Sequence, residues 1–308
     1  MISSSAPGKI ILFGEHAVVY GRPAVAVPVT QVRATVTVSP ASQPGMRVMA
    51  ADIGLNSDLG GLPTGDPLAA AIQGVLRTLG IFSPPALTIQ VSSTIPVAAG
   101  LGSGAAVSVA LIRALSGYLG QLLPDQAVSA LAFEVEKLHH GLPSGIDNAV
   151  ITFSRPVYFV KDQPIITFRI GLPFTLVIAD TGLPAPTKES VGDVHTLWEA
   201  DPPRWERVFD GIGKIAQQAK ENIEKGNWRA LGGLMDSNHV LLQELSVSSP
   251  ELDQLVEAAR RAGALGAKLS GGGRGGNMIA LVEKENALAV ADALSEAGAK
   301  GRLVTQVA

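Results

Sequence analysis

Residues 96–110 read PVAAGLGSGAAVSVA, a glycine-dense turn that runs into small apolar residues without any charge. This pattern predicts a buried helix that begins near Ser103. Glycines let consecutive backbone amides point into one concavity, and a helix start adds partial positive charge, so the segment can hold an anion such as a triphosphate. The alternative is that the glycines only allow the helix to pack closely.

The same turn formally matches the G-x-G-x-x-A fingerprint of dinucleotide-binding proteins. That fingerprint requires a strand ending at the first glycine and an acidic residue about 20 positions later. Here the preceding strand is expected to end near Ser92, Pro96 interrupts the approach, and position 120 is a glycine. The dinucleotide interpretation is therefore weak, and no Walker-type G-x-x-x-x-G-K-[ST] loop occurs in the chain.

The composition is that of a folded protein. The chain has 308 residues, of which 46% are hydrophobic and 17% charged, so it can build a sizeable core. The net charge is -3 and basic residues are not clustered, so the sequence offers no positive patch that would attract nucleic acid. Cysteine is absent, which excludes disulfides and thiolate metal sites. The sequence shows neither a signal peptide nor an apolar membrane span, so we expect a cytoplasmic protein without nucleic-acid or membrane partners.

Hydrophobic periodicity predicts strands and helices in the first half of the chain. Residues 32–38 and 87–91 alternate apolar and polar side chains, as half-buried antiparallel strands do. A helix is expected from Asp66, a capping residue followed by proline, to about residue 79. Two longer helices are expected at 103–119 and 125–140. Residues 40–65 are rich in Gly, Pro, Ser and Asp and are expected to form a surface excursion.

The pattern restarts beyond the loop at 169–173. Strands are expected at 174–180 and 277–283, and helices near 203–225, 228–244, 250–263 and 286–297. Strand pairs followed by helix pairs indicate an α+β fold rather than a doubly wound parallel sheet. We predict two domains, 1–170 and 171–308.

Four stretches carry a family resemblance. They are APGKIILFGEHAVVYGRPAV (6–25), PVAAGLGSGAA (96–106), EVEKLHHGLPSGIDNAV (134–150) and GAKLSGGGRGGNMIAL (266–281). In this order they resemble the GHMP kinase superfamily, and the first and third are similar to its mevalonate kinase family. The resemblance implies a ribosomal-S5-domain-2-like N-terminal half, a ferredoxin-like C-terminal half and an active site between them. It also implies ATP-dependent phosphorylation of the 5-hydroxyl of mevalonate, giving mevalonate 5-phosphate for isoprenoid synthesis, with ATP and Mg²⁺.

Phosphoryl transfer needs the γ-phosphate and the hydroxyl aligned, the developing charge neutralised and the proton of the alcohol accepted. The resemblance makes Asp147 the catalytic base and puts Lys9 beside it, where an ammonium stabilises an incipient alkoxide. It makes Glu136 a ligand of Mg²⁺, with Ser103 as a second candidate. From the residues alone, Asp147 could cap a turn, Lys9 could reach from a strand edge to water, and Glu136 could be a solvated helix residue.

The resemblance also implies contacts with the nucleotide and the substrate. The nucleotide side comprises Ser93, Ala98, Ala99, Gly100, Leu101, Gly102, Ser103 and Gly104. The substrate side comprises Glu15, His16 and Thr187, with Lys188 as a cation for the substrate carboxylate. A threonine in a proline-rich turn is often only a local hydrogen-bonding residue, which is the alternative for Thr187.

The chain departs from the family pattern at four positions. Two of the changes are Ala98, where a glycine is usual, and Asn277, where a cysteine is usual. Mevalonate kinases usually have a second serine in the first glycine loop, as a magnesium ligand, where this chain has Gly104. In the second glycine loop, SGGGRGG (270–276), Arg274 replaces a glycine. Its guanidinium could hold a triphosphate or a carboxylate, or it could point outward.

Other functions fit the same motifs. A related kinase for galactose, homoserine or phosphomevalonate would share the loops, a diphosphomevalonate decarboxylase would share the fold, and a sensor would lack catalysis. The sequence favours mevalonate because GEHAVVYG differs from the corresponding galactokinase motif. Whether the protein forms a homodimer is left open.

Overall fold

The computed structural model describes residues 1–96, 100–140, 144–185 and 187–308. The chain forms two compact units. The first comprises Met1–Gly8, Thr30–Val97 and Leu101–Ser154, and the second comprises Lys9–Val29, Ala98–Gly100 and Arg155–Ala308. Two long strands, β1 (Ile2–Phe13) and β2 (Ala24–Pro40), contribute residues to both units. The domain bounds 1–170 and 171–308 stay a prediction.

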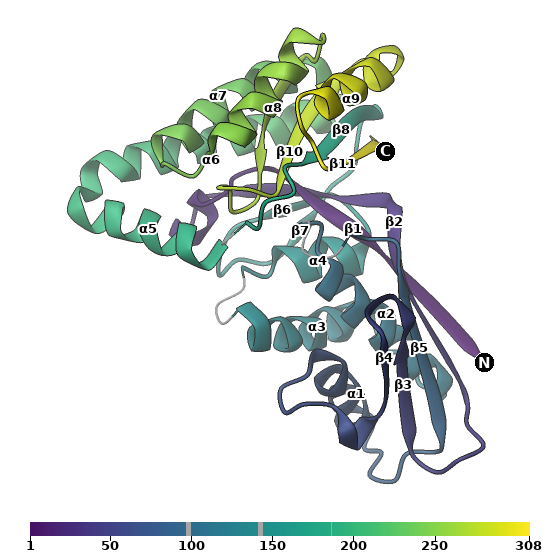
Figure 1. Ribbon diagram of the computed structural model, residues 1–308. Coiled ribbons are helices and arrows are strands. Elements are labelled where there is room, and N and C mark those ends of the chain that lie inside the picture. Colours follow the sequence, from purple (N-terminus) through teal and green to yellow (C-terminus); the bar gives the residue numbers. More distant parts are fainter. Residues whose placement is uncertain (97–99, 141–143, 186) are drawn as a thin grey trace. The chain divides into compact units, whose positions relative to one another are not determined.

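The first unit combines a mixed sheet with packed helices (Figure 1). In this sheet β5 (Leu87–Ser93) pairs antiparallel with β2 and parallel with β3 (Met46–Ala50), and β4 (Leu55–Asp58) pairs with β3. The helices are α1 (Pro67–Thr78), α2 (Ser103–Tyr118), α3 (Asp125–His140) and α4 (Ile146–Phe153). They pack against one another, and α2 also packs on β5.

The expected start of α1 is confirmed at the level of single atoms. The Asp66 carboxylate accepts hydrogen bonds from the amides of Leu68, at 2.8 Å, and Ala69, at 3.0 Å, and Pro67 is the first helical residue. The expected surface excursion at 40–65 is corrected by β3 and β4. Both strands are too short to show a clear alternation; they pair with each other, and only β3 also pairs with a strand outside this segment, β5.

The second unit has a βαββαβ sheet. Its strands β8 (Phe174–Asp180), β9 (Gly266–Ser270), β10 (Asn277–Val282) and β11 (Gly301–Val307) lie in the order β11-β8-β10-β9, and all pairs are antiparallel. This is the ferredoxin-like order that the resemblance implied. The helices between β8 and β9 are α5 (Thr187–Ala200), α6 (Pro202–Glu224), α7 (Leu231–Glu244) and α8 (Pro250–Arg261), and α9 (Ala287–Glu296) precedes β11.

Helices α7, α8 and α9 pack on this sheet and bury it (Figure 1). Every residue of β10 is buried, which explains its continuous apolar sequence. Two short strands, β6 (Val157–Phe159) and β7 (Ile166–Thr167), pair with each other and continue the sheet of β2, because β6 pairs with Ala24–Ala26 of β2. In the part of the chain that the structure describes, no helix has the length and hydropathy of a bilayer span.

Candidate active site

The first glycine loop starts α2 as the sequence predicts. Gly102 has left-handed backbone angles, φ 73 and ψ 34, and Ser103 is the first residue of the helix. The residue before the helix, Gly102, has no side chain that could cap its first amides. Most of α2 is buried, which explains its uncharged sequence. Ala98 and Ala99 lie outside the described residues, and the nucleotide roles of Gly100, Leu101, Gly102, Ser103 and Gly104 stay predictions.

Asp147 lies in the first turn of α4, whereas the sequence placed it in a glycine-rich turn. The helix begins because Gly145 adopts the left-handed conformation, with φ 85, which reverses the chain direction. The neighbouring Asn148 is buried, and its amide nitrogen donates to the Ser129 hydroxyl, at 2.8 Å, and carbonyl, at 3.1 Å, on α3. This anchor fixes the rotation of α4 and therefore the direction in which Asp147 projects. Sequence reasoning missed Asn148, although it follows Asp147 directly.

Glu136 lies on α3 and is only 8% exposed, which disfavours a freely solvated side chain. Within residues 1–96, 100–140, 144–185 and 187–308, no three His, Cys, Asp or Glu side chains gather as metal ligands. Magnesium needs fewer protein ligands than that, because phosphate oxygens and water usually complete its shell. A carboxylate and a hydroxyl are oxygen donors of the kind that such an ion takes, the roles of Glu136 and Ser103 stay predictions, and Gly104 has no side-chain oxygen to add.

Ser93 ends β5 and is tied into a local turn. Its amide donates to the carboxylate of Asp52, at 2.8 Å, and its hydroxyl accepts from the amide of Ile95, at 3.1 Å. These bonds fix the main chain that enters the first glycine loop. The predicted contact of Ser93 with the nucleotide is not tested by them.

A buried ion pair lies beside the predicted substrate residues in the second unit. The carboxylate of Glu15, 2% exposed, pairs with the ammonium of Lys268 on β9, which is fully buried. The side chain of Asn238 on α7, also fully buried, donates to the other Glu15 oxygen at 3.5 Å. Burial lowers the pKa of Lys268, and the Glu15 carboxylate opposes that shift. Removing either charge would leave the other buried without its partner.

The sequence analysis missed Lys268 and Asn238, although a signal for Lys268 was present. A lysine in the middle of the apolar strand GAKLS must find an acceptor if that strand is buried. Nothing comparable marks Asn238, because an asparagine on a helix is usually exposed.

His16 follows Glu15 in a strained turn. Its φ is 60, in the left-handed region, and Gly14 before it has φ 97. Ring atom Nε2 lies 3.0 Å from the carbonyl oxygen of Gly272 and donates to it, so Nδ1 is left as an acceptor. Among the described residues no group lies within hydrogen-bonding reach of the buried Nδ1. Burial lowers the pKa of His16 to about 4; the bond to Gly272 opposes this shift and the charge of Arg274 adds to it. The ring is therefore neutral near pH 7.

Thr187 is the first residue of α5 and is exposed, whereas the sequence placed it in a turn. Its amide donates to the carbonyl of Ala185, at 2.8 Å. A Cβ atom on Gly272 would lie 2.6 Å from the Thr187 hydroxyl, so the second glycine loop passes directly beside this helix start. The structure thus brings His16, Thr187 and the second glycine loop together within one unit.

The remaining predicted catalytic residue, Lys9, lies on β1 and is 6% exposed. A lysine buried to this degree does not extend freely into water, which argues against the strand-edge alternative. Lys9 belongs to the second unit and Asp147 to the first. Their predicted partnership stays a prediction.

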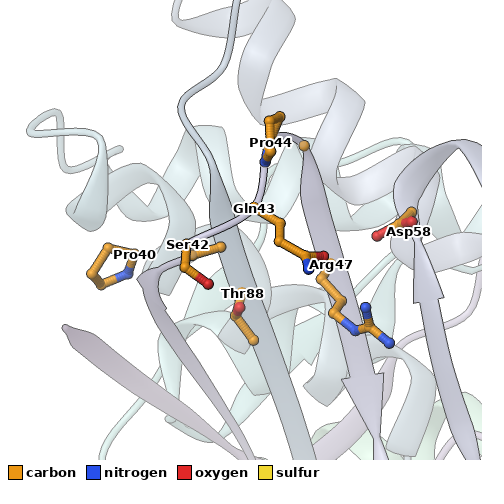
Figure 2. A pocket seen from close by; sticks show the side chains of 9 residues that line it. Pro40, Ser42, Gln43, Pro44, Arg47, Asp58 and Thr88 are labelled. Atoms are coloured by element: carbon orange, nitrogen blue, oxygen red, sulfur yellow. The ribbon is translucent and has the colours of Figure 1, made fainter.

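The first unit has a surface hollow (Figure 2). Its volume is about 300 Å³, and it is lined by Pro40–Gly45, Arg47, Asp58 and Thr88. The Arg47 guanidinium donates to Asn56 at 2.7 Å, so this cation is already engaged on the neighbouring strand. None of the predicted site residues lines the hollow.

Comparisons with known proteins cover both halves of the chain. The family model for the GHMP kinases N terminal domain matches residues 67–155, and the model for GHMP kinases C terminal matches residues 219–300. A mevalonate kinase of Thermococcus gammatolerans is 38% identical over 315 residues, which cover 94% of this chain and 92% of that enzyme. A mevalonate kinase of Pyrococcus furiosus is 37% identical and covers 91% and 89%. The crystal structure of L. major mevalonate kinase in complex with R-mevalonate is 31% identical, has a TM-score of 0.85, and covers 99% and 95%.

These matches and the two sheets define a GHMP kinase, and the predicted α+β fold is confirmed. Within the GHMP kinases, the 38% identity to a mevalonate kinase over 94% of the chain identifies the family. The chain belongs to the mevalonate kinase family.

Proposed function

We propose that the chain transfers the γ-phosphoryl group of ATP to the 5-hydroxyl of mevalonate, as its family name states. The main support for this proposal is the similarity to mevalonate kinases along almost the whole chain. The uncapped start of α2 supports it, because backbone amides at a helix start bind phosphate.

The roles of the residues form part of this proposal. Asp147 accepts the proton of the 5-hydroxyl as the alcohol oxygen attacks the γ-phosphorus, and the bond to the bridging oxygen of ADP breaks. Lys9 favours the carboxylate form of Asp147 and stabilises the developing alkoxide. The amides of Gly102–Gly104 hold the phosphates, and Ser93 contacts the nucleotide.

Glu136 and Ser103 would hold Mg²⁺, which supplies neutralisation of the charge on the phosphate oxygens. A carboxylate is an oxygen donor of the kind that Mg²⁺ prefers, which supports this role of Glu136.

On the substrate side, neutral His16 offers Nδ1 as an acceptor for a hydroxyl, and Thr187 offers a donor and an acceptor. Glu15 is engaged with Lys268, so we propose that it holds the turn that presents His16. Lys188, exposed next to Thr187, is the cation for the carboxylate of mevalonate. Action in the cytoplasm and the absence of nucleic-acid and membrane partners stay sequence predictions, and the question of a homodimer stays open.

The test is a coupled assay with purified protein, ATP and Mg²⁺. The acceptors are mevalonate, galactose, homoserine and mevalonate 5-phosphate, and a separate reaction with mevalonate 5-diphosphate monitors CO₂. We expect ADP with mevalonate alone and no CO₂ in any reaction. Turnover with another acceptor instead of mevalonate, release of CO₂, or no ADP with any acceptor would contradict the proposal.

A further inference from the structure

Arg274 is a non-glycine residue in a backbone conformation that favours glycine. Its φ is 59, and the flanking Gly273 and Gly275 have φ values of 76 and 154. Side chains are rarely found in this region because the Cβ atom crowds the backbone. An arginine kept there points to a contact made by its side chain.

The side chain of Arg274 joins three segments of the second unit. Nη1 forms an ion pair with Asp193 on α5, and Nε donates to the carbonyl of Ser246, at 3.3 Å. The backbone amide of Arg274 donates to the carbonyl of Val247, at 2.8 Å. The second glycine loop is thereby connected both to α5 and to the turn between α7 and α8.

The ion pair is expected to affect the position of α5 more than the stability of the whole protein. The side chains of Arg274 and Asp193 are 31% and 59% exposed, so water still solvates both charges when the pair is broken. Exposed pairs contribute little to global unfolding. What the pair can do is hold α5 in place.

Helix α5 packs against α6 (Figure 1), and its residues Leu197 and Trp198 pack against the core of the unit. Its buried side chains are Ser190 and Val194. Near its end, the indole of Trp198 donates to Glu206 on α6, at 2.9 Å. Asp193 forms the ion pair with Arg274 of the second glycine loop. It lies six residues after Thr187, which is about 9 Å along the helix axis.

We propose that Arg274 is a positioning residue that fastens the start of α5 to the second glycine loop. Thr187 packs beside Gly272, and the Arg274–Asp193 pair holds the helix less than two turns further on. These two points together set where Thr187 and Lys188 stand. This inference rests on the proposed function, because Thr187 and Lys188 are its substrate-side residues.

Kinetics of three variants test the proposal: Arg274→Gly, Asp193→Asn and the double variant. Glycine suits the φ of this position, so Arg274→Gly should fold. We expect each single variant to raise KM for mevalonate about three- to tenfold, while kcat and KM for ATP change less than about twofold. The double variant should be no worse than either single variant, because both remove the same pair.

Asp292→Asn is the matched control. Asp292 pairs with Arg302 in the same unit, and these side chains are 65% and 44% exposed. Its loss should leave KM for mevalonate unchanged. Additive effects of the two single variants, an unchanged KM, or an equal rise for the control would overturn the proposal.

Hydrogen exchange without substrate separates this inference from the proposed function. Amides in the first two turns of α5 should exchange faster in both single variants than in the wild type and in Asp292→Asn. If the wild type does not phosphorylate mevalonate, the proposed function fails, and exchange still decides whether Arg274 holds α5. Unchanged exchange in α5 refutes the fastening role.

Discussion

The two glycine loops share a sequence pattern, yet their glycines serve different purposes. In the first loop, Gly100 and Gly102 have positive φ values of 68 and 73, and a Cβ atom on Gly104 would meet nothing within 4 Å. In the second loop, a Cβ atom on Gly272, Gly273 or Gly275 would lie 2.6, 1.9 or 2.6 Å from atoms of other segments. Among the described residues, the main chain at Gly104 therefore faces open space, whereas Gly272, Gly273 and Gly275 of the second loop lie directly against other segments.

This difference shows what a glycine pattern alone leaves undetermined. Open space beside a helix start suits a ligand that brings its own negative charge. Close approach of backbone to backbone suits a joint that holds neighbouring elements together. We therefore expect alanine at the closely packed glycines of the second loop, Gly272, Gly273 and Gly275, to lower stability, whereas alanine at Gly104 in the first loop should not.

The largest expected effect concerns chemistry in the first unit. Asp147→Asn should lower kcat at least ~10²-fold, because the amide cannot accept the proton of the alcohol. The affinity for ATP and the unfolding midpoint should change little. Stopped-flow or steady-state kinetics and nucleotide titration provide the measurements.

Asp125→Asn is the control for Asp147→Asn, because Asp125 also lies in the first turn of a helix of the same unit. It removes a comparable charge from a helix start and should leave kcat within about twofold. Equal loss of turnover in both variants would mean that helix electrostatics, rather than a base, explains the effect.

The next effect concerns packing in the second loop. Gly273→Ala would put a Cβ atom 1.9 Å from the carbonyl oxygen of Val247, and we expect a loss of about 3 kcal/mol or more in unfolding free energy. Gly271→Ala is the control, because Gly271 also has positive φ, 92, but nothing within 4 Å. It should cost only about 1 kcal/mol. Urea denaturation of both variants makes the comparison, and equal losses would show that backbone strain rather than collision is responsible.

The sequence predicts the long elements well because their signals are local. The Asp66 cap, the alternation in β2 and β5, and the uncharged run of α2 all appear as predicted. The prediction from sequence is wrong at the starts of α4 and α5, where Asp147 and Thr187 were expected in turns. Glycine and proline next to these residues indicate a break, and the structure shows that each break is immediately followed by a helix.

A smaller loss of stability is expected at acidic pH, and it should be larger around the second glycine loop than around the first. His16 donates to Gly272, and His239 accepts from the amide of Leu269, at 3.3 Å, just before the second loop. Burial lowers the pKa of both histidines to about 4. Below about pH 6.5 the unfolded chain takes up protons that the native state does not, so stability falls as pH drops towards 4, by at most about 3 kcal/mol per histidine.

Amide protection factors measured across this pH range test that expectation. The protection of residues 268–276 should fall as the pH is lowered, while that of α2 falls less. His195→Gln provides the control for the loss of an exposed histidine, because the His195 side chain is 54% exposed. A parallel decline in α2 and in the second loop would refute the local effect.

The candidate site was only partly accessible from the sequence, for a physical reason. Motifs name residues that face a ligand, such as Asp147 and His16, but not the side chains that hold them. Asn148 orients α4, and Lys268 neutralises Glu15 from a strand more than 250 residues away in the chain. Such partners are set by tertiary contacts, which no local pattern records.

The smallest expected effect returns to the open position in the first loop. Gly104→Ala adds only a methyl group to the first turn of α2, and it should leave activity unchanged and raise stability by at most about 1 kcal/mol. Gly104→Ser adds a hydroxyl at the place where the family pattern has a magnesium ligand. If Glu136, Ser103 and the nucleotide hold the ion alone in this chain, the serine should lower the Mg²⁺ concentration for half-maximal rate about two- to fivefold. Because the alanine variant fills the same space without an oxygen, an equal shift in both variants would attribute the change to helix stability, and no shift in either would mean that this position does not face the metal.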